Sequence, residues 1–189
     1  MTAPVRGACR EIVDEQDSMG ATRVAIIGNA GAGKSTLARC LAARHELPLL
    51  DLDTVAWMPG ALATARPVPD AIADIHAFCT AHASWVVEGC YANLVAATLA
   101  FRPTLLFLDP GVERCIANCT VRPWEPHKYA TRAEQAAALD FLLTWVREYE
   151  LRKDLLSRSG HETLFTAYDG PKHWLKAMPD AGFVLPTGG

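Results

Sequence analysis

Long apolar runs are absent from this sequence. Mean hydropathy is only +0.09, and no stretch reaches the ~18 uninterrupted apolar residues that a membrane-spanning helix needs. Residues 1–20 also lack the apolar segment of a secretory signal, so we expect a cytoplasmic protein without a membrane partner. Because the same residues show no periodicity, they are predicted to form a flexible N-terminal extension ahead of a single domain over 21–189.

An excess of positive charge is missing as well. The 189 residues include 18 Lys and Arg against 21 Asp and Glu, a formal net charge of −3. Such a chain has no overall field that attracts nucleic acid, so a nucleic-acid partner is not expected. The sequence leaves open whether the protein is a monomer or a homodimer.

Paired cysteine motifs are lacking too. The six cysteines form no CxxC pair, and without a secretory signal they are expected to be reduced thiols. Cys115 and Cys119 are four residues apart on a predicted helix, with His127 beyond them. A metal site is one interpretation of this spacing, and burial as small apolar side chains is the favoured one.

Short apolar runs that alternate with amphipathic stretches are what the sequence does contain. The runs predict strands buried on both faces, at 24–27, 47–52, 85–88, 104–109 and 163–168. The stretches predict helices at 34–45, 71–83, 91–101, 112–120, 132–157 and 172–178, with Gly160 fitting the end of the longest. A capping box, Thr131 with Glu134, begins that helix. The alternation predicts an α/β fold, a three-layer αβα sandwich around a parallel sheet of about five strands.

One phosphate-binding motif is complete. It fits G-x-x-x-x-G-K-[ST], a P-loop or Walker A motif, and it follows a predicted strand and opens a helix, as that motif requires. Backbone N–H groups of such a loop surround phosphate oxygens, its Lys reaches the β- and γ-phosphates, and its Ser binds Mg²⁺. The sequence therefore predicts binding of ATP with Mg²⁺ by Gly28, Asn29, Ala30, Gly31, Ala32, Gly33, Lys34, Ser35 and Thr36.

Acidic residues end the neighbouring strands. Glu88 and Asp109 each end an apolar run and either can support the metal, with Glu88 favoured. Asp51 and Asp53 follow the second strand, and their spacing places both carboxylates on one side. In a kinase, such a carboxylate holds and deprotonates the acceptor hydroxyl. A turn with Asp53 as the helix N-cap is the alternative, and Trp57 either lines this pocket or belongs to the core.

Positive charge for a transferred phosphoryl group gathers in one segment between two predicted helices. It contains Arg122, Trp124, His127, Lys128, Tyr129 and Arg132. We expect a mobile lid over about 121–132 that closes over the phosphates, and a polar surface loop is the alternative. Arg147 and Arg152, on the following helix, are further candidates for phosphate contact, although Arg152 can instead pair with Glu148.

These motifs resemble those of adenylate-kinase-related P-loop proteins, in particular the group called DNA topology modulation protein-like. The similarity covers about residues 23–178 and rests on the P-loop with the following TLA, LDxxxWxPG (52–60), WVVEGxY (85–91), FLxxW (141–145) and GPK (170–172). The resemblance implies a nucleoside/nucleotide-kinase-like fold with an acceptor-binding insertion over about 53–83 and a lid. It also implies that Glu88 stands at the Walker-B-like position and that a loop near Gly170 and Pro171 borders the adenine.

The chain departs from adenylate kinases at two positions. The arginine that follows their third strand and grips the acceptor phosphate is absent from the run 88–91, and the segment 53–57 also has none. A carboxylate beside a Trp suits a neutral or cationic hydroxyl compound, while a nucleotide acceptor stays open. The D-x-D spacing has a weaker parallel in shikimate-kinase-like enzymes.

Two functions therefore remain. In the first, an ATP- and Mg²⁺-dependent phosphotransferase acts on a small-molecule or nucleotide acceptor. Asp53 or Asp51 positions the acceptor, and Arg122 with Arg147 or Arg152 neutralises the moving phosphoryl group. In the second, an ATP-binding regulatory module hydrolyses ATP slowly and acts through a protein or nucleic-acid partner. No GTPase-like N-K-x-D motif is present to indicate guanine binding.

Overall fold

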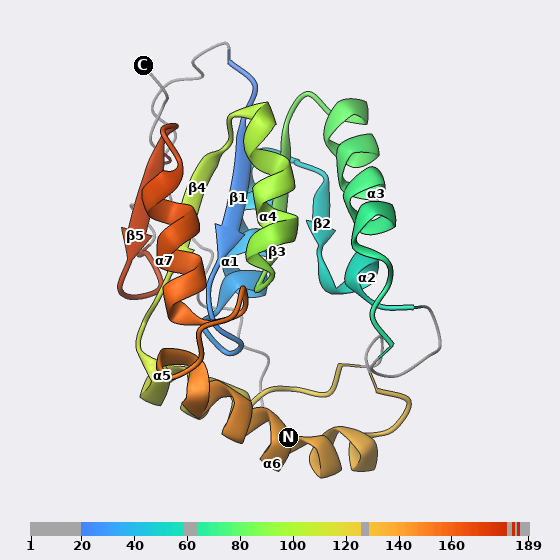
Figure 1. Ribbon diagram of the computed structural model, residues 1–189, viewed down its shortest axis with the longest axis vertical. Coiled ribbons are helices and arrows are strands. Elements are labelled where there is room, and N and C mark those ends of the chain that lie inside the picture. The colour runs from blue at the N-terminus through green and yellow to red at the C-terminus, as the bar shows by residue number, and fades with distance from the viewer. Residues whose placement is uncertain (1–19, 59–63, 126–128, 181–182, 184, 186–189) are drawn as a thin grey trace.

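The computed structural model describes residues 20–58, 64–125, 129–180, 183 and 185. It confirms the predicted α/β fold: one parallel sheet of five strands in the order β2-β3-β1-β4-β5. The strands are β1 (Arg23–Ile27), β2 (Leu49–Asp51), β3 (Trp85–Gly89), β4 (Thr104–Leu108) and β5 (Lys172–Leu175). Because all run in one direction, their carboxyl ends meet at a single edge of the sheet (Figure 1). The predicted extension lies outside the described residues except for Gly20.

Helices cover both faces of the sheet, as a three-layer sandwich requires. Alternate strand residues such as Ala25 and Ile27 pack against α2 (Asp53–Ala56), α3 (Val68–Ala81), α4 (Ala92–Thr98) and α7 (Arg158–Ala167). The intervening residues, such as Val24 and Ile26, pack against α1 (Lys34–His45) and α5 (Val112–Thr120). Since β3 and β4 are buried along their whole length, their sequences are apolar runs, interrupted in β3 by the buried Glu88.

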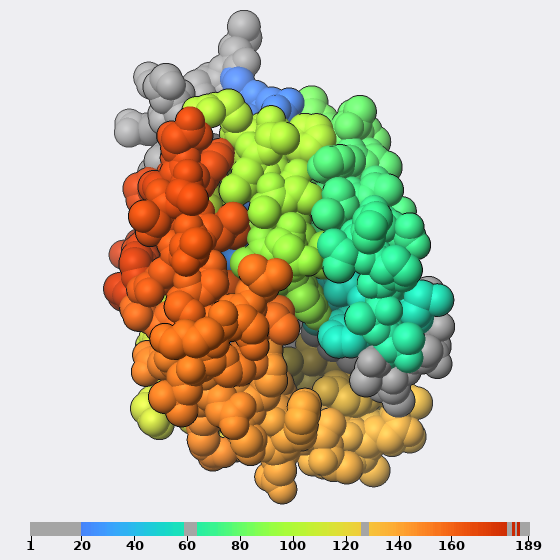
Figure 2. Space-filling model, in the orientation of Figure 1, coloured from blue at the N-terminus to red at the C-terminus, as the bar shows by residue number. Residues whose placement is uncertain are grey.

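A further helix lies across the carboxyl edge rather than on a face. This is α6 (Arg132–Arg147), which packs against α5 and forms a roof beyond the strand ends (Figure 1). The predicted capping box is confirmed in part. The Thr131 hydroxyl accepts the N–H of Glu134 at 3.1 Å, but the Glu134 carboxylate accepts the N–H of Ala130, the residue before the cap, at 3.0 Å. The molecular surface is hollowed between α6 and the helices α2–α4 (Figure 2).

The predicted end of this helix at residue 157 is wrong. The α-helix stops at Arg147 and a 3₁₀ turn, Glu148–Glu150, follows. Tyr149 is buried in this turn, and its hydroxyl hydrogen-bonds to Nδ1 of His161 in α7. The contact joins the turn to the helix that follows it. Gly160 does not end a helix but lies inside α7, where an added Cβ would meet the carbonyl oxygen of Asp154 at 2.4 Å.

The predicted strand at 163–168 and helix at 172–178 are also wrong. Residues 158–167 form α7, and the fifth strand is Lys172–Leu175, which pairs in parallel with β4. The overlooked signal was Ser157, whose hydroxyl caps α7 by accepting the N–H of Gly160 at 3.1 Å. The short run 172–175 lies at the sheet edge and becomes a strand through its pairing with β4.

The cysteines agree with the expectation in part. Cys79, Cys90, Cys115 and Cys119 are not disulfide-bonded, and Cys115 and Cys119 are buried as apolar side chains. Cys40 is disulfide-bonded, contrary to the expected reduced state. Among the described residues, no group of three His, Cys, Asp or Glu side chains is placed to hold a metal, and no helix is long and apolar enough to cross a membrane.

Candidate functional site

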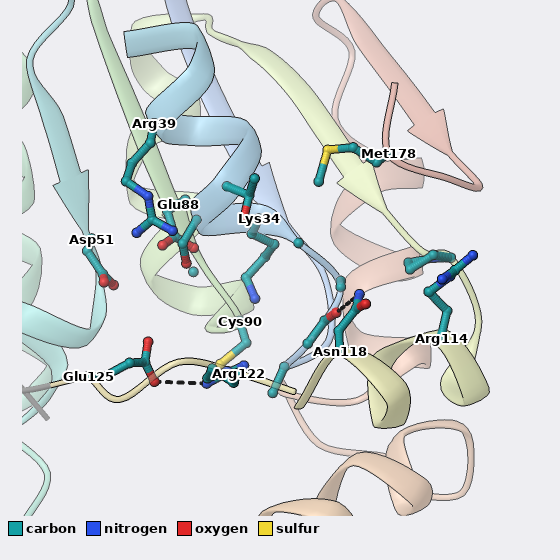
Figure 3. A pocket seen from close by; sticks show the side chains of 18 of the residues that line it. Lys34, Arg39, Asp51, Glu88, Cys90, Arg114, Asn118, Arg122, Glu125 and Met178 are labelled. Carbon is teal, nitrogen blue, oxygen red and sulfur yellow. Dashed lines mark hydrogen bonds and ion pairs between the residues drawn. The ribbon is translucent and has the colours of Figure 1, made fainter. Parts of the chain in front are cut away.

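A cleft of about 1000 Å³ opens along the carboxyl edge of the sheet. Its walls come from segments far apart in the sequence (Figure 3): the P-loop and the start of α1, the ends of β2 and β3, and residues 121–125 and 176–178. This is the edge at which open α/β sheets bind ligands.

The P-loop joins β1 to α1 in a conformation that its glycines permit. Gly33 has φ 101° and Gly31 has φ 77°, both in the left-handed region. An added Cβ on Gly31 would meet the carbonyl oxygen of Cys115 at 2.3 Å, so the loop also needs glycine to pack against α5. The Asn118 amide then holds the loop from α5 by donating to the Gly31 carbonyl oxygen at 2.8 Å.

Lys34 and Asn29 connect this loop to the roof. The buried Lys34 ammonium donates to the carbonyl oxygen of Asn29 at 3.0 Å. The Asn29 amide in turn donates to the carbonyl oxygen of Val146, in the last turn of α6, at 3.2 Å. The residues predicted to bind nucleotide, 28–36, thus form one loop and helix start beneath the roof.

Glu88 lies beside the start of α1, as predicted. In the sheet it is the neighbour of Ile26 on one side and Asp51 on the other, and it lines the cleft together with Ser35. Burial raises the pKa of its carboxyl, Lys34 and Ser35 act to lower it, and Asp51 and Asp53 add to the rise. A hydroxyl and one carboxylate fit Mg²⁺ that takes its other ligands from phosphate and water.

Asp109, the other metal candidate, has different partners. Its Oδ2 lies 3.1 Å from Lys176 Nζ and 3.3 Å from Arg158 Nε, and it accepts the indole N–H of Trp174 at 3.3 Å. These contacts join the end of β4 to α7 and β5, which is a structural role. Glu88 is therefore the better candidate for the metal.

Asp51 and Asp53 both line the cleft, but their side chains differ in what they bind. Asp51 Oδ1 accepts the backbone N–H of Asp53 at 2.9 Å, and so closes the turn after β2. Asp53 is the first residue of α2, whose N-cap is Leu52, and its Oδ1 accepts the hydroxyl of Tyr91 at 2.7 Å. The alternative of Asp53 as N-cap is wrong. Trp57, 39% exposed, donates its indole N–H to the same Tyr91 oxygen at 2.8 Å and is not a core residue.

The described part of the predicted lid is tied to α6. Arg122 lines the cleft and pairs with Glu125 at 3.1 Å; burial acts to lower its pKa, but Glu125 and Cys119 outweigh that effect and raise it. Gln135 of α6 accepts the N–H of Glu125 at 2.8 Å and donates to the Pro123 carbonyl at 3.1 Å. His127 and Lys128 lie outside the described residues. Whether the segment moves stays a prediction.

Arg147 and Arg152 are not among the residues that line the cleft. Arg147 is exposed at the end of α6, while the guanidinium of Arg152 stacks on Trp145 at 3.9 Å from the ring centroid. Arg39 and Arg114 line the cleft instead (Figure 3), and neither was predicted. A signal for Arg39 existed, because it follows Ser35 by four residues and so shares its helix face.

The expected position of the adenine loop is wrong. Gly170 and Pro171 precede β5, and the Pro171 carbonyl accepts the N–H of Leu105 near the start of β4, so both lie at the amino end of the sheet. Residues after β5 reach the cleft, and Met178 lies where a Cβ on Gly33 would be. The expectation fails because the fifth strand is Lys172–Leu175, later in the chain than the apolar run at 163–168.

Comparison with known proteins finds solved structures that are similar only at low sequence identity and low TM-score. No protein-family model matches the chain, and no characterised protein sequence matches it significantly. A sugar kinase from a Janibacter species shares 15% identity over 82% of this chain and 84% of that one, at a TM-score of 0.49. Shikimate kinase from Acinetobacter baumannii shares 18% over 76% and 90%, at 0.42. Shikimate kinase from Bacteroides thetaiotaomicron shares 16% over 77% and 97%, also at 0.42. Likeness this low carries no activity over to the chain.

Proposed function

We propose that this protein is an ATP- and Mg²⁺-dependent phosphotransferase that acts on a small hydroxyl-bearing acceptor. One observation carries the proposal: Glu88 is flanked in the sheet by Asp51, and Glu88, Asp51, Asp53 and Ser35 of the P-loop all line the same cleft. The cleft thus has a phosphate-binding side and, next to it, a side with carboxylates that a hydroxyl group can approach. The motif resemblance to adenylate-kinase-related proteins supports the same activity.

The residues divide the reaction between them. Lys34 and the P-loop N–H groups would hold the β- and γ-phosphates, and Ser35 and Glu88 would hold Mg²⁺, which would neutralise phosphate charge. Asp53 orients the acceptor hydroxyl and receives its proton as the acceptor oxygen bonds to the γ-phosphorus and the bond to the β-phosphate oxygen breaks. Arg122, beside the cleft, stabilises the negative charge on the transferred group.

An ATP-consumption screen tests the proposal. Purified protein with Mg²⁺ and ATP is incubated with nucleoside monophosphates, nucleosides, sugars, hydroxy acids or amino alcohols, and with no acceptor. We expect one class to stimulate turnover, with the phosphorylated acceptor detected by mass spectrometry, and Lys34→Ala to remove the stimulation. Turnover that no compound changes would contradict the proposal and support the regulatory ATPase alternative.

A further inference from the structure

A chain of two hydrogen bonds ends on the carboxylate that faces the acceptor. The indole N–H of Trp57 donates to the hydroxyl oxygen of Tyr91 at 2.8 Å, and the Tyr91 hydroxyl donates to Asp53 Oδ1 at 2.7 Å. The rings of Trp57 and Tyr91 meet edge to face, with centroids 6.4 Å apart. The three side chains come from three segments: the start of α2, the strand-like residue after it, and the turn after β3.

The direction of both bonds is fixed by chemistry. An indole nitrogen can only donate, and an ionised carboxylate can only accept. The Tyr91 oxygen therefore receives the Trp57 proton and gives its own proton to Asp53. Burial raises the pKa of Tyr91, with Cys90 and Asp53 adding to the rise, so the hydroxyl stays a donor at every working pH. Donors in series polarise one another, which strengthens the bond to the carboxylate.

The position of Tyr91 joins the two sides of the cleft. It follows Glu88, Gly89 and Cys90, which line the cleft directly beyond β3, and it is the N-cap residue of α4. Its backbone is therefore set by the strand that carries the metal candidate, while its hydroxyl reaches the carboxylate on the acceptor side. The backbone of Asp53 is fixed independently, through its N–H bond to Asp51. Side chain and backbone of Asp53 are thus both held.

From this geometry we infer that Tyr91, oriented by Trp57, is a positioning residue that sets the Asp53 carboxylate for the acceptor hydroxyl. The inference rests on the proposed phosphotransferase function. It assigns to Trp57 and Tyr91 an effect on the transfer step rather than on nucleotide binding, because neither side chain belongs to the phosphate-binding side of the cleft. The carboxylate keeps its orientation when the acceptor is absent, so alignment does not have to be created on binding.

Steady-state kinetics of hydroxyl-deletion variants test the inference. The probe is the screen compound that most stimulates wild-type turnover. Tyr91→Phe should lower kcat for that compound about tenfold, the loss expected when a hydrogen bond to a charged group is removed. The acceptor KM and the dissociation constant of Mg²⁺–ATP should stay within about twofold. Trp57→Phe, which keeps a ring but loses the N–H, should lower kcat by a smaller factor of about three.

A matched control separates positioning from general stability. Tyr168→Phe removes another buried hydroxyl, which donates to the Pro103 carbonyl at 2.6 Å on the amino side of the sheet, and it should leave kcat unchanged. In an Asp53→Asn background, Tyr91→Phe should cause no further loss, because it acts through Asp53. A Tyr91→Phe enzyme with wild-type kcat, or with equal losses in transfer and ATP affinity, would overturn the inference while leaving the function standing. A wild-type enzyme that no acceptor stimulates would overturn the function itself, and the inference with it.

Discussion

Glu88 is buried between Asp51 and the P-loop, where loss of water raises the pKa of its carboxyl from the usual 4.5. At pH values between the unfolded and the folded pKa, the folded state therefore binds a proton that the unfolded state has released. Its stabilising effect is present below the unfolded pKa and is lost as pH rises through the folded pKa. Glu88→Gln should unfold at a higher temperature than wild type at pH 8 without nucleotide, and the two should converge near pH 4. Thermal unfolding followed by circular dichroism measures this.

Glu88→Gln should also weaken the binding of Mg²⁺. Loss of the carboxylate should raise the Mg²⁺ concentration needed for half-maximal turnover about tenfold or more. Asp109→Asn is the control for a buried strand-end acid, and it should lower stability without this change in Mg²⁺ requirement. A Glu88→Gln protein that is less stable at pH 8 would show that Lys34 and Ser35 outweigh burial.

The stability that His161 contributes should depend on pH in the opposite direction. It is fully buried, donates from Nε2 to the Cys90 carbonyl at 2.8 Å, and accepts the Tyr149 hydroxyl at Nδ1 at 2.7 Å. Burial lowers its pKa from 6.5 to about 4. The neutral ring therefore stabilises the fold above pH 6.5, and about 3 kcal/mol is lost as pH falls towards 4.

Urea unfolding at a series of pH values measures this loss. His161→Gln offers a donor and an acceptor but does not titrate, so its free energy of unfolding should change less between pH 6.5 and 4 than that of wild type. An identical pH dependence in the two proteins would show that His161 is not the group responsible.

Among the elements, α6 depends on its first turn. Thr131→Ala removes the hydroxyl that accepts the backbone N–H of Glu134. The substitution should lower the free energy of unfolding by about 1 kcal/mol and speed amide exchange at the start of α6. Thr144→Ala, in the middle of the same helix, removes only a bond to the Asp140 carbonyl and should be neutral or slightly stabilising. Equal effects at the two sites would contradict a capping role. Urea unfolding and hydrogen exchange provide the comparison.

The elements also show how far the sequence alone predicts this fold. The first four strands and α1, α4 and α5 carry their own signals, in continuous apolar runs or clear helix starts. Residues 163–168 are rich in β-branched and aromatic side chains, yet His161, Leu164, Phe165 and Tyr168 repeat at helical spacing, so local pattern could not decide between strand and helix. The run 172–175 is too short to identify without its partner β4.

The residues of the candidate site also divide into those that the sequence alone identifies and those that it does not. The P-loop, Glu88 and the Asp51–Asp53 pair could be found because each ends a strand or fits a motif, and carboxyl ends of parallel strands meet at one edge. Tyr91, Arg39 and Arg114 could not be identified as site residues from the sequence, because their position in the site depends on contacts between separate segments. Their positive charge alone suggests Arg147 and Arg152 for phosphate contact. Charge does not determine which face of a helix points into the cleft.

At the scale of the whole molecule, nucleotide binding should be visible as stability. A ligand that binds only the folded state adds about 2.7 kcal/mol at a concentration of 100 times its dissociation constant. Mg²⁺–ATP should therefore raise the melting temperature of wild type by several degrees, as measured by differential scanning fluorimetry. Lys34→Ala should abolish the shift, while Lys153→Ala, exposed and away from the cleft, should retain it. A full shift in Lys34→Ala would contradict nucleotide binding by the P-loop.

The roof over the cleft has a consequence for how such a protein can change over time. It is built from a single uninterrupted stretch between β4 and α7, whereas the sheet and the P-loop are encoded outside that stretch. That stretch nevertheless holds the P-loop in place, because Asn118 bonds to the Gly31 carbonyl and Val146 accepts the amide of Asn29. It also carries Arg122, which lines the cleft. Recombination that exchanged this stretch would therefore have to preserve these contacts, whereas the acceptor side, with Asp53 and Tyr91, is encoded earlier in the chain and could be changed without replacing it.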